Sequence, residues 1–194
     1  LLTFYGDEIK NQIWQIQSGL EIILKRISDG NKICKTGHLK SIKNSCYIKN
    51  NTEKITKMIN RLIQIKGVDI NCRSNGFTLL TYASQYNEIE LVKNLLKFED
   101  INVNIYSPSL GNSPLQIAIQ SENVEIAKLL IEFPKTDINH VNFDDVSALN
   151  NAIFKTLEDV VLMLINHPKF DPIESRINCG IASSNIKIAE ILSN

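Results

Sequence analysis

Ser113-Pro114-Leu115-Gln116-Ile117-Ala118 is the most complete copy of a segment that returns at regular intervals along this chain of 194 residues. Its Leu-x-x-Ala core is matched by Leu80-Thr81-Tyr82-Ala83 and by Leu149-Asn150-Asn151-Ala152, and successive alanines lie 35 and 34 residues apart. A second apolar group begins 8 residues after each alanine. A fixed period of this length predicts a repeat protein in which each unit is one supersecondary element.

Each copy also begins with a residue type that starts helices. Thr78, Ser113 and Ser147 stand directly before an apolar run, where a hydroxyl can accept a hydrogen bond from the unpaired amides of a first helical turn. Pro114 suits the first helical position, because an amide hydrogen is not needed there. The pattern therefore predicts a helix after each of these hydroxyl residues.

The second apolar group of each unit predicts a second helix. In the middle unit, Ile126, Leu129 and Leu130 follow the i, i+3, i+4 spacing of an apolar stripe. A single unit cannot bury such a stripe by itself, so neighbouring units are expected to stack on one another. We accordingly expect Leu129 to be a buried residue of the core.

The repeat resembles the ankyrin repeat. The matching pieces are Gly76-Phe77-Thr78-Leu79-Leu80, Gly111-Asn112-Ser113-Pro114-Leu115 and Asp145-Val146-Ser147-Ala148-Leu149, where the family has Gly-x-Thr-Pro-Leu-His. Only the second copy keeps the proline and none keeps the histidine, which is expected to weaken the local helix caps. The resemblance covers residues 67–194 and implies an all-α repeat fold, an α-solenoid, with short hairpin fingers between the helix pairs.

The spacing divides the chain into an N-terminal third and an array of repeats. The array is predicted to hold three full units and a shortened fourth, at residues 67–100, 101–135, 136–169 and 170–194. The N-terminal third is predicted to contain an amphipathic helix at 1–30 and a divergent helical cap or degenerate repeat at 31–66.

The N-terminal helix leaves two interpretations open. Its apolar residues follow a heptad spacing: Ile9, Ile13, Ile16, Leu20, Ile23 and Ile27. The stripe either packs on its own chain as a cap over the first unit, or forms a coiled coil with a partner or a second copy. Residues 1–66 carry 12 basic and 5 acidic side chains, whereas residues 67–194 carry 9 basic and 16 acidic ones. Regions of opposite sign can attract one another or different partners.

The sequence offers no catalytic constellation, cofactor motif or metal site, so we expect a protein that is not an enzyme. The histidines are dispersed at positions 38, 140 and 167, and no cysteine is placed to form a nucleophilic pair with them. Cys34, His38 and Cys46 lack a fourth ligand and match no common zinc spacing. A Gly-rich phosphate loop is also missing from the sequence.

The resemblance implies binding to another protein through the finger tips and the exposed side of the first helices. Carried over by position, the candidate binding residues are Ser74, Asn75, Phe77, Gln85 and Tyr86 in the first unit, Tyr106, Leu110, Asn112 and Gln120 in the second, and Phe143, Asp144, Val146, Phe154 and Lys155 in the third. The expected function is that of an adaptor or scaffold. The alternatives are a structural component of a cytoskeletal or filament-associated assembly, and the ankyrin part of a longer enzyme or secreted effector.

The sequence also bounds the location and the partners. No apolar run approaches the length of a membrane span, and few aromatic residues accompany the basic N-terminal third, which disfavours nucleic acid. We expect a cytoplasmic protein, with association to the cytoskeleton as a second option. The chain begins with Leu1 and not with Met, which leaves open that the native N-terminus is missing.

Overall fold

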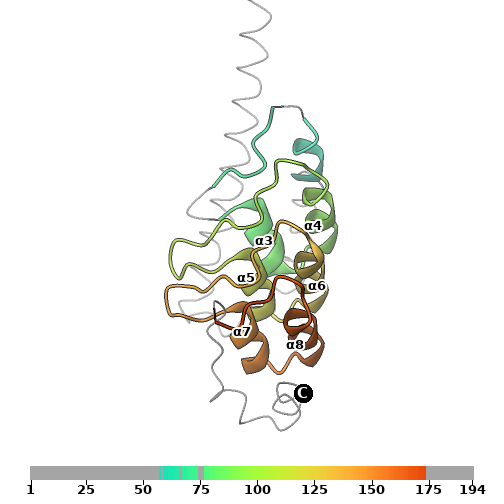
Figure 1. Cartoon of the computed structure of the whole chain (residues 1–194). Coiled ribbons are helices and arrows are strands. Elements are labelled where there is room, and N and C mark those ends of the chain that lie inside the picture. The colour runs from blue at the N-terminus through green and yellow to red at the C-terminus, as the bar shows by residue number, and fades with distance from the viewer. Residues whose placement is uncertain (1–56, 58, 66, 74–76, 174–194) are drawn as a thin grey trace, which may run out of the picture. The chain divides into compact units, whose positions relative to one another are not determined.

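The structure is a computed structural model, and it describes residues 57, 59–65, 67–73 and 77–173 (Figure 1). The chain forms two compact units, Leu1–Leu79 and Leu80–Asn194, and each is described here by itself. The predicted N-terminal helix, nearly all of the predicted cap and most of the shortened fourth repeat lie outside the described residues.

In the N-terminal unit, the described residues include the end of a helix. Residues 59–62 are helical, and the amide of Ile63 donates to the carbonyl of Ile59 at 3.0 Å. Both of these isoleucines are buried, and so are Val68 and Ile70 farther along. This helix lies within the segment 31–66, and the roles proposed for that segment stay predictions.

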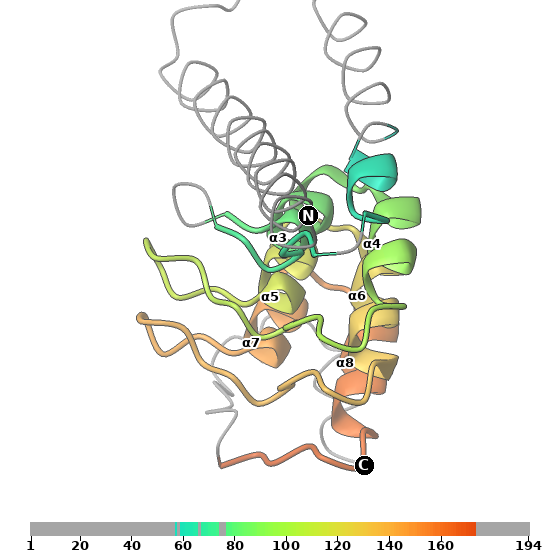
Figure 2. The same cartoon turned by 90° about the horizontal axis from the view of Figure 1, so that it is seen from above.

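The second of the two compact units contains three pairs of helices. They are α3 (Leu79–Tyr86), which begins at the boundary, and α4 (Ile89–Leu95), α5 (Pro114–Gln120), α6 (Val124–Glu132), α7 (Ala148–Phe154) and α8 (Glu158–Ile165). Figures 1 and 2 show α3, α5 and α7 in one row and α4, α6 and α8 in a second row, with hairpin fingers extending to one side of the first row. Helix α5 contacts α6 and α7, and α8 contacts α6 and α7. The predicted all-α stack with short fingers is confirmed.

The core of this unit follows the repeat. Ala83, Ala118 and Ala152 are completely buried, because a small side chain allows the paired helices to approach closely. The apolar stripe on α6 is centred on Ile126, Ala127 and Leu130, which are fully buried.

The prediction that Leu129 is a core residue is wrong. This side chain is only half-buried, and its register equivalents Asn94 and Met163 are also partly exposed. At 100° per residue, Leu129 falls on the edge of the stripe, while Leu130 lies near its centre. Leu95, Leu130 and Leu164, which share one register position in the second helix of each unit, are all buried.

The serine caps form as predicted, and in the second repeat unit Gln116, where the family has histidine, completes the cap. The Ser113 hydroxyl accepts from the Gln116 amide at 3.2 Å, and the Gln116 side-chain oxygen accepts from the Ser113 amide at 2.9 Å. This reciprocal pair is a capping box. In the third unit, Ser147 accepts from the amide of Asn150 at 3.1 Å.

The bend between the two helices of each unit uses a left-handed backbone. Asn87, Glu122 and Thr156, each 4 residues after a repeat alanine, have φ of 60°, 60° and 56°. The amide of the next residue donates to the carbonyl of that alanine at 2.9–3.0 Å in all three units. This geometry ends a helix sharply and turns the chain back into the second row. Among the described residues, no helix is long and apolar enough to cross a membrane.

Candidate protein-binding surface

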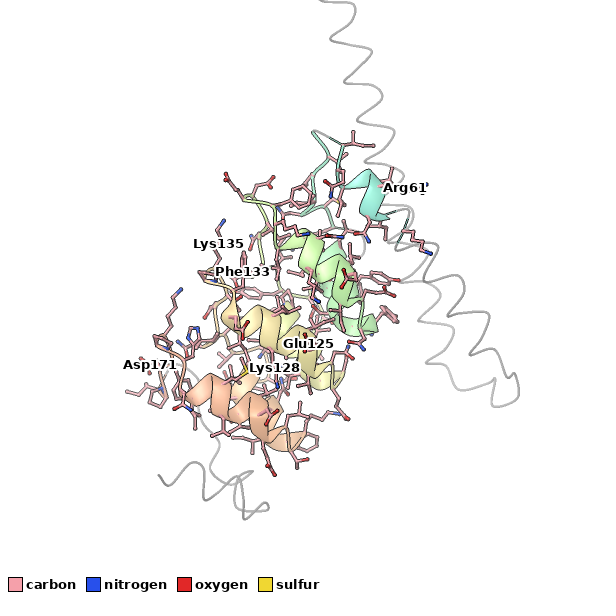
Figure 3. All side chains as sticks on the ribbon, turned by 90° about the vertical axis from the view of Figure 1, so that its right-hand side faces the viewer. Arg61, Glu125, Lys128, Phe133, Lys135 and Asp171 are labelled. Atoms are coloured by element: carbon pink, nitrogen blue, oxygen red, sulfur yellow. The ribbon has the colours of Figure 1, made fainter. Side chains whose placement is uncertain are left out.

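The bases of the fingers are held in register by asparagine side chains. The amide nitrogen of Asn104 donates to the Lys135 carbonyl at 2.8 Å, and its oxygen accepts from the Asp137 amide at 2.9 Å. Asn139 makes the same two bonds one unit later, at 2.7 and 3.0 Å. Lys135 and Asp171, the latter a partner of Asn139, lie along one edge of the array (Figure 3).

Sequence reasoning missed the role of these asparagines, although the signal was present. The Asp-Ile-Asn motif at residues 69–71 recurs as Asp-Ile-Asn at 137–139 and, with a substitution, as Asn-Val-Asn at 102–104. In each case the first side chain accepts from the amide of the last residue at 2.8–3.1 Å. The motif is therefore a turn that presents its final side chain to the neighbouring unit, as the bonds of Asn104 and Asn139 show.

A buried layer of amide side chains connects the second and third fingers. Asn112 is only 5% exposed; it donates to the Gln120 side-chain oxygen at 3.1 Å and accepts from Asn142 at 2.8 Å. Gln116 adds a bond from its nitrogen to the Val146 carbonyl at 2.6 Å. The prediction that Asn112 offers an exposed contact is thus contradicted, since its polar atoms join one finger to the next.

Tyr106 is part of the same joint. Its ring stacks on that of His140 with centroids 3.8 Å apart and planes 3° from parallel. Nε2 of His140 is 2.7 Å from the carbonyl oxygen of Gly111, so this nitrogen carries the hydrogen and donates it. Partial burial raises the pKa of Tyr106, and the negative charge of Asp137 acts in the same direction. The phenol is therefore neutral at physiological pH, and its ring is committed to finger packing on one face.

The tips of the second and third fingers present large apolar side chains to solvent. Phe143 is 71% exposed and Leu110 is 44% exposed. The Phe143 amide donates to the Leu110 carbonyl at 2.9 Å. Gly111 has φ of 71°, and a Cβ there would come within 2.7 Å of the Phe143 ring. The missing side chain of Gly111 thus makes room for the Phe143 ring.

A second exposed aromatic residue lies at the far end of the third unit. Phe154 is the last residue of α7 and is also 71% exposed. Helix α7 has 7 residues and so is about 10 Å long, which separates Phe154 from the finger that precedes the helix. Beside it, Lys155 forms an ion pair with Glu122 at 2.8 Å. Phe143 and Phe154 therefore belong to two distinct patches.

The remaining predicted residues are less prominent. Phe77, Gln85, Tyr86, Gln120 and Val146 are half-buried, and Asp144 is exposed. The Tyr86 ring lies 4.9 Å from that of Tyr82. Ser74 and Asn75 lie outside the described residues. Binding by any member of the set stays a prediction.

The described part of the chain holds no group of three or more histidine, cysteine or acidic residues that could bind a metal ion. Cys72 is buried. The predicted absence of zinc at Cys34, His38 and Cys46 concerns residues outside the described ranges.

Comparison with known proteins identifies the repeat. The family model for ankyrin repeats in three copies matches residues 46–142 and 99–176. The chain is 38% identical over 80 residues to the Notch-regulated ankyrin repeat-containing protein of Homo sapiens, a match that covers 41% of this chain and 68% of the relative. The protein of the same name from Xenopus tropicalis is 36% identical, with the same coverage. Protein B of that name from Danio rerio is 36% identical over 41% of this chain and 69% of its own. The chain belongs to the ankyrin repeat family.

Proposed function

We propose that the chain is a non-catalytic adaptor or scaffold that binds another protein through its finger tips and the exposed side of its first helices. Ankyrin repeats are in general protein-interaction modules. The observation that carries the proposal is Phe143, which stays 71% exposed although it is a large aromatic side chain on an ordered finger. Exposed aromatic residues on rigid supports are typical anchors of protein interfaces.

The fingers are prepared for binding because their conformation is fixed before a partner arrives. The stack of Tyr106 on His140 and the bond between the Phe143 amide and Leu110 hold the two tips together. Less conformational freedom is then lost on association, which favours affinity. Tyr106 supports the surface in this proposal, and Asn112 is left out of it because its amide is buried.

The test is affinity capture from cells of the source organism, with the full chain and with three variants as bait. The variants are Phe143→Ser, Phe154→Ser and the double change. Captured proteins are identified by mass spectrometry and then purified for titration calorimetry. We expect the double variant to lose partners that the wild type binds while its helical circular dichroism signal is unchanged. Unaltered affinity in the double variant would move the interface away from these surfaces.

A structural role in a larger assembly is the second candidate. It is favoured by the opposite charges of residues 1–66 and 67–194, which can attract neighbouring copies. Sedimentation velocity at low and high salt separates the two roles. Self-association that disappears at high salt supports the assembly, whereas a monomer at both salt concentrations supports the adaptor. In either case the chain could be part of a longer enzyme or effector, a proposal that full-length transcripts would test.

A further inference from the structure

The tips of the second and third fingers combine apolar surface with charge of one sign. We define the finger-tip patch as Leu110, Phe143, Asp144 and Asp145. All four residues are exposed. Residues 104–112 and 139–147, which form the two fingers, contain no lysine or arginine, and within the described part of the chain the Asp144 carboxylate has no basic partner. The patch therefore joins an apolar ridge to the exposed carboxylate of Asp144.

The acidic residues are held next to the apolar ridge by the turn itself. The Asn142 side-chain oxygen accepts from the amides of Asp144 and Val146 at 3.0 and 2.9 Å. Asp145 has φ of 58°, a left-handed conformation that aspartate tolerates better than most residues. These constraints fix the backbone of both aspartates directly after Phe143.

We infer that the finger-tip patch receives a partner protein segment in which a large apolar side chain is flanked by lysine or arginine. This inference rests on the proposed function, and it adds the chemistry of the partner. The apolar side chain covers Leu110 and Phe143, and removing that surface from water drives the contact. The basic side chains meet the carboxylate of Asp144, while an acidic partner segment is repelled there. Complementary charge sets the choice of partner and the rate of association more than the affinity itself.

The patch around Phe154 differs in charge and provides the matched control. Phe154 has the same exposure as Phe143, but its neighbour Lys155 is already paired with Glu122. The cation next to Phe154 is therefore already paired, whereas the residue that follows Phe143 is the exposed Asp144. Phe143→Ser and Phe154→Ser thus remove the same side chain at equal exposure in two electrostatic settings.

The probe is a displayed library of random 12-residue peptides, selected against the full chain. We expect enriched peptides to place a large aliphatic or aromatic residue beside lysine or arginine. Chosen peptides are then titrated by fluorescence anisotropy against Phe143→Ser, Phe154→Ser and Asp144→Asn. Asparagine keeps the size of aspartate, so the last variant tests the charge of Asp144 alone.

Phe143→Ser should weaken binding of these peptides about thirty-fold or more, as loss of an interface anchor does, and Phe154→Ser should weaken it clearly less. Asp144→Asn should weaken binding about twofold to fivefold, within the range of one exposed charge pair, and should reduce the dependence of binding on salt. Enriched peptides that are acidic or uncharged, or whose binding depends on Phe154 and not on Phe143, overturn the inference but leave the proposed function standing. A selection that enriches no peptide counts against both.

Discussion

The second and third repeat units share a register but fill their outer positions differently. In the second unit, Gln120, Asn123 and Lys128 reach toward neighbouring units. Asn123 donates to the Ser84 carbonyl at 2.7 Å, Lys128 pairs with Asp159 at 3.0 Å, and Gln120 donates to the Asn151 side chain at 3.5 Å. In all three cases the bond joins residues more than 30 positions apart in the sequence.

In the third unit, apolar residues occupy the same three positions. They are Phe154, Leu157 and Leu162, of which Phe154 and Leu162 are exposed. The second repeat unit is therefore the polar joint of the array, because its side chains bond to both of its neighbours. The third repeat unit has apolar side chains at the same positions, and two of them are exposed. We therefore expect substitutions in the second unit to affect stability first, and substitutions of exposed residues in the third unit to affect binding first.

The largest effect on stability is expected from the core of the second unit. Leu130→Ala should lower the free energy of unfolding by about 2–5 kcal/mol, because it leaves a cavity among fully buried side chains. Urea unfolding followed by circular dichroism measures the loss. The neighbouring variant Leu129→Ala is the control and should cost clearly less, since that side chain is half-buried. Equal losses would show that the register of the stripe is wrong.

The polar joint itself can be broken at Gln116. Gln116→Ala should cost about 1–3 kcal/mol, because it removes half of the capping box and leaves the Val146 carbonyl without the Gln116 donor. Ser113→Ala removes a cap only and should cost about 1 kcal/mol. Thermal unfolding of both variants compares the two losses. If Ser113→Ala proves the more damaging, the bond between the units contributes little.

A gain in stability is expected at the bend of the third unit. Thr156 is β-branched yet has φ of 56°, and Thr156→Gly should stabilise the protein by about 1 kcal/mol by relieving this conformation. Asn87→Gly, at the same register position, should change stability by only a few tenths of a kcal/mol, because asparagine accepts positive φ. Chemical unfolding measures both. A destabilised Thr156→Gly variant would contradict the strain argument.

The smallest effect is expected from the ion pair between the two units. The side chain of Lys128 is 34% exposed and that of Asp159 is 74% exposed, so the pair is open to solvent on one side. Lys128→Leu, which gives the second unit the residue found in the third, should change the free energy of unfolding by less than about 1 kcal/mol. Melting temperatures at low and high salt test this expectation, and a large loss confined to low salt would reveal a stronger pair.

Much of this fold was predictable because its signals are local. The spacing of Ala83, Ala118 and Ala152 and the hydroxyl residues at 113 and 147 predicted the helix pairs and their serine caps, which depend on neighbours within one turn. Leu129 and Leu130 could not be separated in the same way, since both are leucines on one face and only the packing of the adjacent unit distinguishes them.

The candidate surface was predicted only in part. Phe143, Phe154 and Leu110 are exposed as the resemblance implied. Asn112 was misjudged as an exposed contact residue, and the stacking of Tyr106 was not predicted, because their partners, Asn142 and His140, come from the next finger. A contact between residues 30 or more positions apart does not affect the spacing of residues within one repeat unit. From the sequence alone, a side chain that joins two fingers therefore cannot be told from one that is exposed to a ligand.

The asparagine ladder at the finger bases has a consequence for how the array can grow. Asn104 and Asn139 each offer a donor and an acceptor to backbone groups on the two sides of the junction with the next unit, much as a peptide group would. A tandem duplication of the 35 residues from one such asparagine to the next would therefore create a junction already complementary to itself. Recombination within the gene, or insertion of a repeat in the laboratory, would lengthen the row of fingers without requiring a new interface between repeat units.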